Sequence, residues 1–331
     1  MSLIKTQEEL KALMPTSALK NIATYATLIE RAEDAHLRPL LGDALYEYVV
    51  ENYENKNKNE DENEKDTTLL PLCQSIALYT MVADNIGIFA VSFNGGSGVA
   101  TVSAEGYQPA DEKEKKALSA DLWHNALRDT DRLLDILEKD ARSAKPRYAE
   151  MWKESEYFYL QGDLLISTAK EALRYVRSSE QPYSRVDFVK QLGDLRFSQM
   201  ATISMAIGEE WLQWLVRYDR MSPEEREASH ASHPHICTAL EYLRQTLMCA
   251  ARHRRSGKPA DEQDANLSLF RAREYMQKHQ EEMGEVFKTS PLYHEVNENE
   301  NEDENKIRCC RKTNASIYNT GEAAVFTPFP M

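Results

Sequence analysis

The stretch LLGDALYEYVV (40–50) decides the fold class, because a related stretch, AIGEEWLQWLV, recurs at 206–216. In each copy a glycine, Gly42 or Gly208, precedes an acidic residue and then a stripe of aromatic and aliphatic residues. Apolar residues three and four positions apart share one face of a helix. Both stretches therefore predict an amphipathic helix that starts after a glycine and buries one face.

Three further blocks correspond between the two halves of the chain, in the same order. In the first block each half holds a Thr-x-x-Glu string, which predicts a capping box at the start of a helix. In the second block Cys73 aligns with Cys237, and in the third the tetrapeptide PADE opens a predicted helix. The matched segments are LIKTQEELKALM (3–14) with LISTAKEALRYV (165–176), LPLCQSIALYTMVA (70–83) with HPHICTALEYLRQT (233–246), and PADE at 109–112 with PADE at 259–262.

The matching blocks predict a mainly α fold built from two tandem, divergent helical-bundle modules. Module one is expected at 1–145 and module two at 160–290, with insertions confined to loops. Within module one, 54–66 is acidic and rich in asparagine, which predicts a disordered loop. Residues 86–107 alternate apolar side chains around NGGSG and predict a projecting β-hairpin. Residues 291–331 are expected to form a flexible acidic linker and an apolar tail.

The composition and charge of the chain argue against several classes of protein. The chain has 331 residues, with 40 Lys and Arg against 54 Asp and Glu, and a formal net charge of −14. This charge disfavours a general nucleic-acid-binding protein, which needs a basic surface. No apolar run is long enough to span a membrane, and the first residues do not resemble a secretory signal. An odd number of cysteines suits reduced thiols, so we expect a soluble protein made in the cytoplasm.

The predicted hairpin and tail are the candidate partner-binding elements. An isolated two-stranded hairpin is marginal in water, so a long one is expected to dock on another surface. The tail NASIYNTGEAAVFTPFPM (314–331) is apolar and can add to a sheet edge or fill a groove. The predicted partner-binding residues are Phe89, Val91, Phe93, Gly95, Gly98, Val99, Tyr318, Val325, Phe326 and Phe329.

No residue pattern predicts catalysis or a bound cofactor. The stretch HASHPHIC holds His230, His233, His235 and Cys237, which are residue types that suit zinc. Their spacing matches no common zinc pattern, so we predict no metal site. No Ser-His-Asp or Cys-His arrangement follows from spacing, and adjacent carboxylates on a helix do not share a face. The sequence therefore predicts a protein that is not an enzyme.

The order of these features resembles a known family. A capping box is followed by AEDAHLRPLLGDALY (32–46), a further helix, a glycine-rich hairpin and a long helix led by PADE. This order resembles head–tail connector proteins, also called adaptor or head-completion proteins, of tailed phages and prophages, in a double-length version. The resemblance is stronger over 1–145 than over 160–290.

The resemblance implies a structural component of the virion that forms a ring between portal and tail. Its implied partners are other copies of itself, the portal protein, and tail or neighbouring ring proteins. DNA would only pass through the ring as cargo, and no membrane partner is implied. The protein would be made in the bacterial cytoplasm and become part of the virion.

Two other functions stay open from the sequence. The first is a cytosolic helical protein-binding module without a virion role, which would be a monomer that captures a soluble partner. The second is a metal-dependent enzyme built around His230, His233 and His235, for which metal analysis of the purified protein is the direct test.

Overall fold

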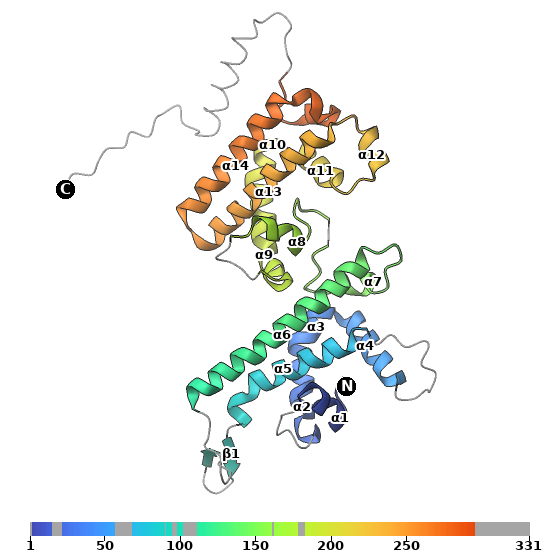
Figure 1. Ribbon diagram of the computed structural model, residues 1–331, viewed down its shortest axis with the longest axis vertical. Coiled ribbons are helices and arrows are strands. Elements are labelled where there is room, and N and C mark those ends of the chain that lie inside the picture. The colour runs from blue at the N-terminus through green and yellow to red at the C-terminus, as the bar shows by residue number, and fades with distance from the viewer. Residues whose placement is uncertain are drawn as a thin grey trace, which may run out of the picture. The chain divides into compact units, whose positions relative to one another are not determined.

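The computed structural model describes residues 2–14, 22–56, 68–89, 91–94, 98–101, 111–160, 162–177 and 183–294. These residues are mainly helical, as predicted, and Figure 1 labels their helices and strands. The first elements are α1 (Gln7–Leu13), α2 (Ile22–Ala32), the π-helix η1 (Glu33–Leu37), α3 (Arg38–Leu41), α4 (Asp43–Lys56), α5 (Leu70–Phe89), β1 (Val91–Asn94), β2 (Gly98–Thr101), α6 (Glu112–Ala141) and α7 (Ala149–Trp152). The later elements are α8 (Ala169–Ala172), the 3-10 helix η3 (Leu173–Tyr175), α9 (Arg185–Ser198), the π-helix η5 (Gln199–Ser204), α10 (Met205–Ile207), α11 (Glu209–Tyr218), α12 (Pro223–Ala228), α13 (His233–Ser256), α14 (Pro259–Lys278), and the 3-10 helices η6 (Gln280–Met283) and η7 (Glu285–Thr289).

Contacts group the described residues into two compact units. Unit 1 comprises those within Met1–Gln161, Thr168–Leu173 and Arg177–Leu192. Unit 2 comprises those within Gly162–Ser167, Arg174–Val176 and Gly193–Met331. Each unit has its own buried apolar residues.

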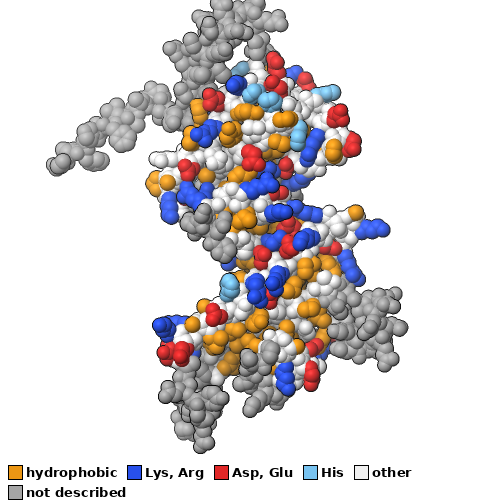
Figure 2. Space-filling model, viewed as in Figure 1, with side chains coloured by type: hydrophobic (Ala, Val, Ile, Leu, Met, Phe, Trp, Pro, Cys, Tyr) orange, Lys and Arg blue, Asp and Glu red, His pale blue; other side chains and the backbone are white. Residues whose placement is uncertain are grey.

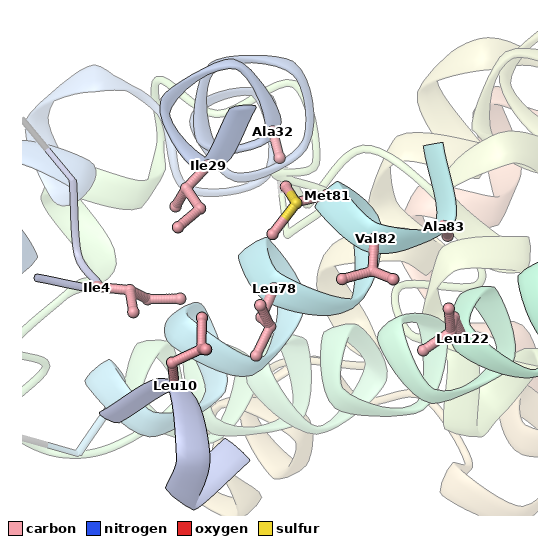
Figure 3. Close-up of a cluster of buried hydrophobic side chains, with 9 residues drawn as sticks. All are labelled: Ile4, Leu10, Ile29, Ala32, Leu78, Met81, Val82, Ala83 and Leu122. Atoms are coloured by element: carbon pink, nitrogen blue, oxygen red, sulfur yellow. The ribbon is translucent and has the colours of Figure 1, made fainter. Parts of the chain in front are cut away.

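Helix α5 is the centre of unit 1. It is apolar around most of its circumference, so it needs cover on several sides, and α1, α2 and α6 pack against it. By length and apolarity it could cross a membrane, but 56% of its apolar window is buried inside the protein, so we interpret it as a core helix. Figure 3 shows the buried cluster around it, formed by Ile4, Leu10, Ile29, Ala32, Leu78, Met81, Val82, Ala83 and Leu122.

The first residues of the segment predicted to be a hairpin are helical. Helix α5 continues to Phe89, whose ring packs edge-on against Tyr25 at a centroid distance of 5.6 Å. This contact with the core favours helix over strand at Phe89, and the assignment of that residue to a strand was wrong. Strands β1 and β2 follow and pair antiparallel, with Phe93 opposite Val99. The loop predicted at 54–66 begins later than expected, because 54–56 continue α4, and 57–66 lie outside the described residues. The remaining parts of 86–107 also lie outside the described residues.

The helices predicted to start after glycine do so. Helix α4 begins directly after Gly42 and helix α11 directly after Gly208. The two glycines have φ of 77° and 88°, a region that L side chains rarely adopt. A Cβ atom on Gly42 would also lie 3.0 Å from the backbone nitrogen of Ser155, and one on Gly208 would lie 2.9 Å from Pro291 Cδ. Both positions therefore favour glycine for two reasons, the positive φ and the lack of room for a Cβ atom.

The most deeply buried positions around the two glycines also correspond. Residues at equal sequence distances from Gly42 and Gly208 are buried in pairs, each with no exposed area. These pairs are Ile29 with Leu195, Leu37 with Ile203, Leu41 with Ile207, and Leu45 with Trp211. A π-helix precedes the glycine in each unit, η1 in unit 1 and η5 in unit 2.

The first residue of the π-helix η1 in unit 1, Glu33, is a buried polar side chain. Glu33 Oε1 accepts a hydrogen bond from the backbone nitrogen of Leu3 at 2.8 Å, and its Oε2 accepts one from Tyr46 Oη at 2.8 Å. Gln74 Nε2 donates to the carbonyl oxygen of Leu3 at 2.7 Å. Burial raises the pKa of Glu33, and the hydrogen bonds from Leu3 and Tyr46 act against that rise. These side chains hold the N-terminal segment against the helices.

Unit 2 holds its first segment in the same way. Gln199 stands as far before Gly208 as Glu33 stands before Gly42, and its Oε1 accepts from the backbone nitrogen of Leu165 at 2.8 Å. Gln199 Nε2 donates to the carbonyl oxygen of Asp163 at 2.7 Å. Arg244 Nε donates to the carbonyl oxygen of Leu165 at 2.9 Å. We call Glu33 and Gln199, with these bonds, the buried acceptors.

Two of the matched blocks differ from the sequence alignment. The side chains that bind the carbonyl oxygens of Leu3 and Leu165 are Gln74 and Arg244, so the register of this block is shifted relative to the alignment. The cysteines do not take equivalent positions, since Cys73 is fully buried and Cys237 is half-buried. Apolar residues recur every three or four positions in any core helix, so the pattern alone could not fix this register.

The PADE strings also differ in role. In unit 1 Asp111 caps α6 in a capping box with Glu114. In unit 2 the helix starts earlier, with Pro259 in its first turn, and Asp261 is buried and accepts from Ser256 Oγ at 3.0 Å. Proline at the first helical position has no N–H of its own, so the first turn has one backbone donor fewer to satisfy.

Candidate functional site

The structure describes only half of the predicted partner-binding residues. Phe89 lies at the end of α5, Val91 and Phe93 lie in β1, and Gly98 and Val99 lie in β2. The other five lie outside the described residues: Gly95, Tyr318, Val325, Phe326 and Phe329. A partner-binding role for these residues stays a prediction, and Phe89 already has a partner within its own unit.

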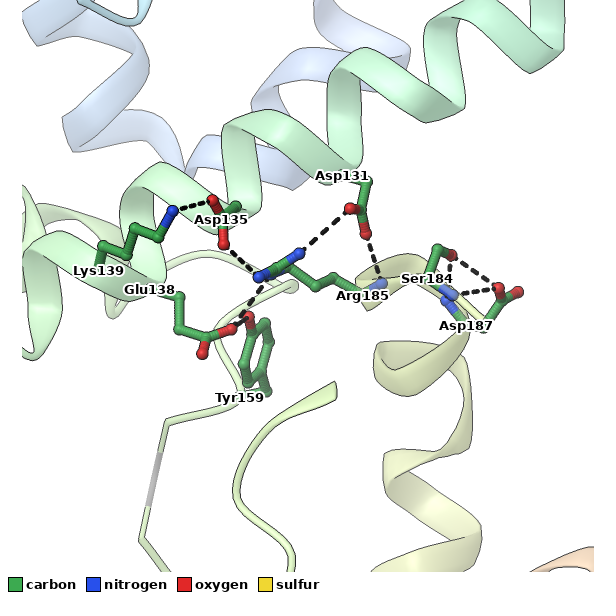
Figure 4. Close-up of polar contacts among 8 residues, drawn as sticks. All are labelled: Asp131, Asp135, Glu138, Lys139, Tyr159, Ser184, Arg185 and Asp187. Carbon is green, nitrogen blue, oxygen red and sulfur yellow. Dashed lines mark hydrogen bonds and ion pairs between the residues drawn. The ribbon is translucent and has the colours of Figure 1, made fainter. Parts of the chain in front are cut away.

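The densest polar contacts in unit 1 surround Arg185. Helix α6 places Asp131, Asp135 and Glu138 on one face, and Arg185, the first residue of α9, reaches all three (Figure 4). Arg185 Nη1 lies 3.1 Å from Asp131 Oδ2, and Nε lies 3.2 Å from Glu138 Oε2. Tyr159 Oη donates to the same oxygen of Glu138 at 2.6 Å.

The electrostatics of this cluster are those of a structural ion-pair network. Burial opposes the charge of Arg185, but the charges of Asp131 and Asp135 outweigh it and raise the pKa of Arg185. Burial and the bond to Glu138 raise the pKa of Tyr159. A shallow hollow beside the network is lined by Leu72, Asp131, Arg132, Asp135, Ile136 and Arg185. Asp131 and Asp135 pair with Arg185, and Arg132 pairs with Asp129 beside the hollow, so these charges are already engaged within the protein.

Unit 2 carries a stripe of exposed apolar side chains along α9, η5 and α10. Phe197, Met200 and Met205 are 51%, 71% and 80% exposed. The guanidinium of Arg254 stacks over the Phe197 ring at 3.8 Å, which covers one side of that ring. We call Phe197, Met200 and Met205 the apolar stripe.

Unit 1 has different side chains at the same distances from its glycine. They are Arg31, Asp34 and Pro39, and both charged residues are exposed. Apolar side chains of unit 1 reach the surface elsewhere: Ile88, Leu118 and Leu127 lie on α5 and α6, the region where Figure 2 shows hydrophobic side chains at the surface. The apolar stripe therefore distinguishes unit 2 from unit 1.

The histidine-rich stretch does not form one cluster. His230 lies in a turn with φ of 55°, and the two histidines of α13 that follow it point in different directions. His233 contacts Tyr218 Oη at 3.3 Å and Cys237 Sγ at 3.5 Å. His235 instead contacts Tyr275 of α14. Residues two apart on a helix are separated by roughly 200° of rotation, which explains the division.

The histidine that sequence reasoning missed is His279. It is the residue at which α14 ends, and its ring centroid lies 4.3 Å from that of His235. Glu282 in η6 completes a group of three whose possible metal-binding atoms all lie within 4.8 Å of one another. The sequence does contain a local signal, because a histidine and a glutamate three residues apart share a helical face, but nothing in it links that pair to His235.

Comparison with known proteins gives no relative. No family model matches the chain, and no curated protein and no solved structure matches it.

Proposed function

We propose that the chain is a structural virion component, a head–tail connector that forms a ring between portal and tail without catalysis. The proposal rests on the sequence resemblance and on one structural observation. The same buried acceptor, in the same place before the same kind of glycine, holds the first segment of each unit.

The buried acceptors support the interpretation that the two units arose by duplication of one helical module. A polar side chain in a core costs free energy unless it is hydrogen-bonded, so such a residue is kept only where the surrounding backbone satisfies it. Finding the matched pair Glu33 and Gln199, each bound to an equivalent leucine amide, favours common descent over independent origin. In both units these buried hydrogen bonds hold the first segment against the helices, which suits a protein that acts through its surfaces.

The apolar stripe supplies a candidate contact between copies. Burial of exposed methionine and phenylalanine side chains against a partner lowers the free energy of the complex, and the flexible methionine side chain adapts to varied surfaces. Strands β1 and β2 and residues 306–331 are the other proposed contacts, to the portal or a neighbouring subunit. The charged residues Arg31 and Asp34 at the matching place in unit 1 would keep that unit from the same contact.

Size-exclusion chromatography with light scattering and negative-stain imaging test the proposal, with and without the portal protein. We expect rings or higher-order species from the full chain, alone or on the portal. Met200→Glu with Met205→Glu should abolish them, because burying two carboxylates in an interface is costly. The matched control is Leu127→Glu, an exposed apolar residue of unit 1, which should leave assembly unchanged.

Removal of residues 306–331 should prevent incorporation into particles while both units stay folded. Normal incorporation of the shortened chain would count against the tail as a contact. A strict monomer that ignores the portal and captures a soluble cellular protein would favour the alternative function, a cytosolic helical binding module.

A further inference from the structure

We infer that unit 2 binds one divalent transition-metal ion of the zinc class, held by His235, His279 and Glu282. This inference goes beyond the proposed connector role and does not depend on it. The three residues come from α13, the end of α14 and η6, so a bound ion would cross-link three elements that are far apart in sequence.

The ligand types match zinc. Two imidazoles and one carboxylate are a common protein ligand set for this ion, with water in the fourth position. The three candidate donor atoms already lie within 4.8 Å of one another. A tetrahedral ion with bonds of about 2.1 Å needs donors about 3.4 Å apart, so small side-chain rotations would bring them onto an ion. Glu282 is exposed, and its Oε1 already lies 3.9 Å from Nδ1 of His279.

A hydroxyl group outside the ligand set orients one imidazole. Tyr275 Oη lies 2.8 Å from His235 Nδ1, and this contact leaves Nε2 of His235 as its ligand atom. Metal-binding histidines usually use their second ring nitrogen in this way, which fixes the ring and its tautomer. The Tyr275 ring also lies 4.6 Å from the His279 ring, so one tyrosine supports both imidazoles.

The backbone beneath the three ligands is held in place independently. The backbone nitrogen of Ser232, at the start of α13, donates to the carbonyl oxygen of Glu282 at 2.7 Å. Gly284, with φ of 85°, lets η6 approach so closely that a Cβ there would lie 3.1 Å from Ala231 Cβ. Helices α13 and α14 pack along their length. The ligands therefore stand on a scaffold that needs little ordering when the ion binds.

The surroundings also allow an ion to reach the three residues. His235 and His279 are partly exposed, and Figure 2 shows histidine side chains at the surface over the end of α14. The other metal-capable pair nearby, His233 with Cys237, lies on the opposite side of α13 against Tyr218. That pair offers two ligands against three, and it provides a control within the same helix.

The test is a titration of the purified full chain, first freed of metal with a chelator, with Zn²⁺ and with Co²⁺. We expect one ion per chain at this site and Co²⁺ d–d bands of a tetrahedral or five-coordinate site, without the near-ultraviolet band of a cobalt–thiolate bond. Glu282→Gln and His279→Ala should each weaken Zn²⁺ binding by more than about 10-fold. Tyr275→Phe should weaken it by about 10-fold to 100-fold through the lost orientation of His235.

His233→Ala is the matched control and should bind Zn²⁺ with unchanged affinity. Circular dichroism of each variant separates loss of binding from loss of fold, and the exposed Glu282 is the variant least able to disturb the fold. Absence of cobalt d–d bands in the intact chain would overturn the inference. So would a cobalt–thiolate band, or binding that survives Glu282→Gln and His279→Ala but is lost in His233→Ala.

Discussion

Unit 1 and unit 2 each hold their first segment with a buried acceptor, but the chemical group of the acceptor differs. The buried acceptor is a carboxylate, Glu33, in unit 1 and a carboxamide, Gln199, in unit 2, and each accepts from a leucine amide at 2.8 Å. The second atom of each head group differs in role, because Glu33 accepts from Tyr46 whereas Gln199 donates to a carbonyl oxygen. The comparison teaches that the fold needs the acceptor oxygen, and that the remaining atom is fitted to its neighbours.

Gln199→Glu should have the largest effect on stability. A carboxylate oxygen would replace the amide group that donates to the carbonyl oxygen of Asp163, and both oxygens would be acceptors. We expect a loss of about 3 to 4 kcal/mol in the free energy of unfolding of unit 2. Protonation of the new side chain restores a donor, so the loss should shrink in mild acid.

Urea unfolding, together with hydrogen exchange of residues 162–167, measures this loss in unit 2. The control is Gln213→Glu, the same change at an exposed position of unit 2, which should cost no more than about 0.5 kcal/mol. Equal effects of the two changes would show that the buried acceptor of unit 2 does not distinguish oxygen from nitrogen.

Gly42→Ala and Gly208→Ala come next. Each puts a side chain at a positive φ and against packed atoms, Ser155 in unit 1 and Pro291 in unit 2. We expect each to cost about 2 to 3 kcal/mol in its own unit. The measurement is chemical unfolding followed by circular dichroism.

Two helical glycines provide matched controls for these changes. Gly87 and Gly193 have nothing within 4 Å of an added Cβ atom and lie within α5 and α9. Alanine at either position should stabilise by up to about 1 kcal/mol. A stabilising Gly42→Ala or Gly208→Ala would contradict the equivalence of the two turns.

Glu33→Gln should make unit 1 resemble unit 2 and have a smaller effect. Burial raises the pKa of Glu33 above its ordinary value of 4.5, so folded unit 1 holds the proton more tightly than the unfolded chain does. The stability of unit 1 should therefore fall as pH rises from 4.5 through the raised pKa, and then level off. Glutamine should remove this slope and change stability near neutral pH by less than about 1 kcal/mol.

The measurement is the unfolding free energy of the wild-type chain and the Glu33→Gln variant across this pH range, with hydrogen exchange at residues 2–14 to assign the change to unit 1. Persistence of the whole slope in the variant would assign it to other groups.

The smallest stability change is expected for Arg31→Phe with Asp34→Met, which gives unit 1 part of the apolar stripe. Both residues are exposed, so the free energy of unfolding should change by less than about 0.5 kcal/mol. Self-association should nevertheless increase, and light scattering measures it. An unchanged mass would mean that apolar side chains at these positions are not sufficient for contact between copies.

Local signals in the sequence were sufficient for some parts of the fold. The Thr6 capping box with Glu9 is confirmed, and Thr168 accepts from the backbone nitrogen of Glu171 as expected. The helix starts after Gly42 and Gly208 are confirmed because a glycine at positive φ is a strong and local constraint. Such features depend on a few neighbouring residues, which a sequence displays directly.

Features that depend on packing could not be predicted in the same way. The alignment of Cys73 with Cys237 was wrong because apolar residues recur at similar intervals along any core helix, so several registers fit the pattern equally well. Phe89 was placed in a strand because its contact with Tyr25 is not visible in sequence. The proximity of His279 to His235 was not predicted, because His279 follows the last residue of α14 and only the packing of α13 on α14 brings the two rings together.

The apolar circumference of α5 has a consequence for synthesis. The ribosome completes α5 before it makes α6, the longest of its partners, and residues 90–111 lie between them. During that interval the nascent chain displays an apolar helix whose main cover does not yet exist, which is the kind of segment that chaperones bind and that otherwise aggregates. Slowing translation just after α5 should therefore lower the yield of soluble protein more than slowing it after α6.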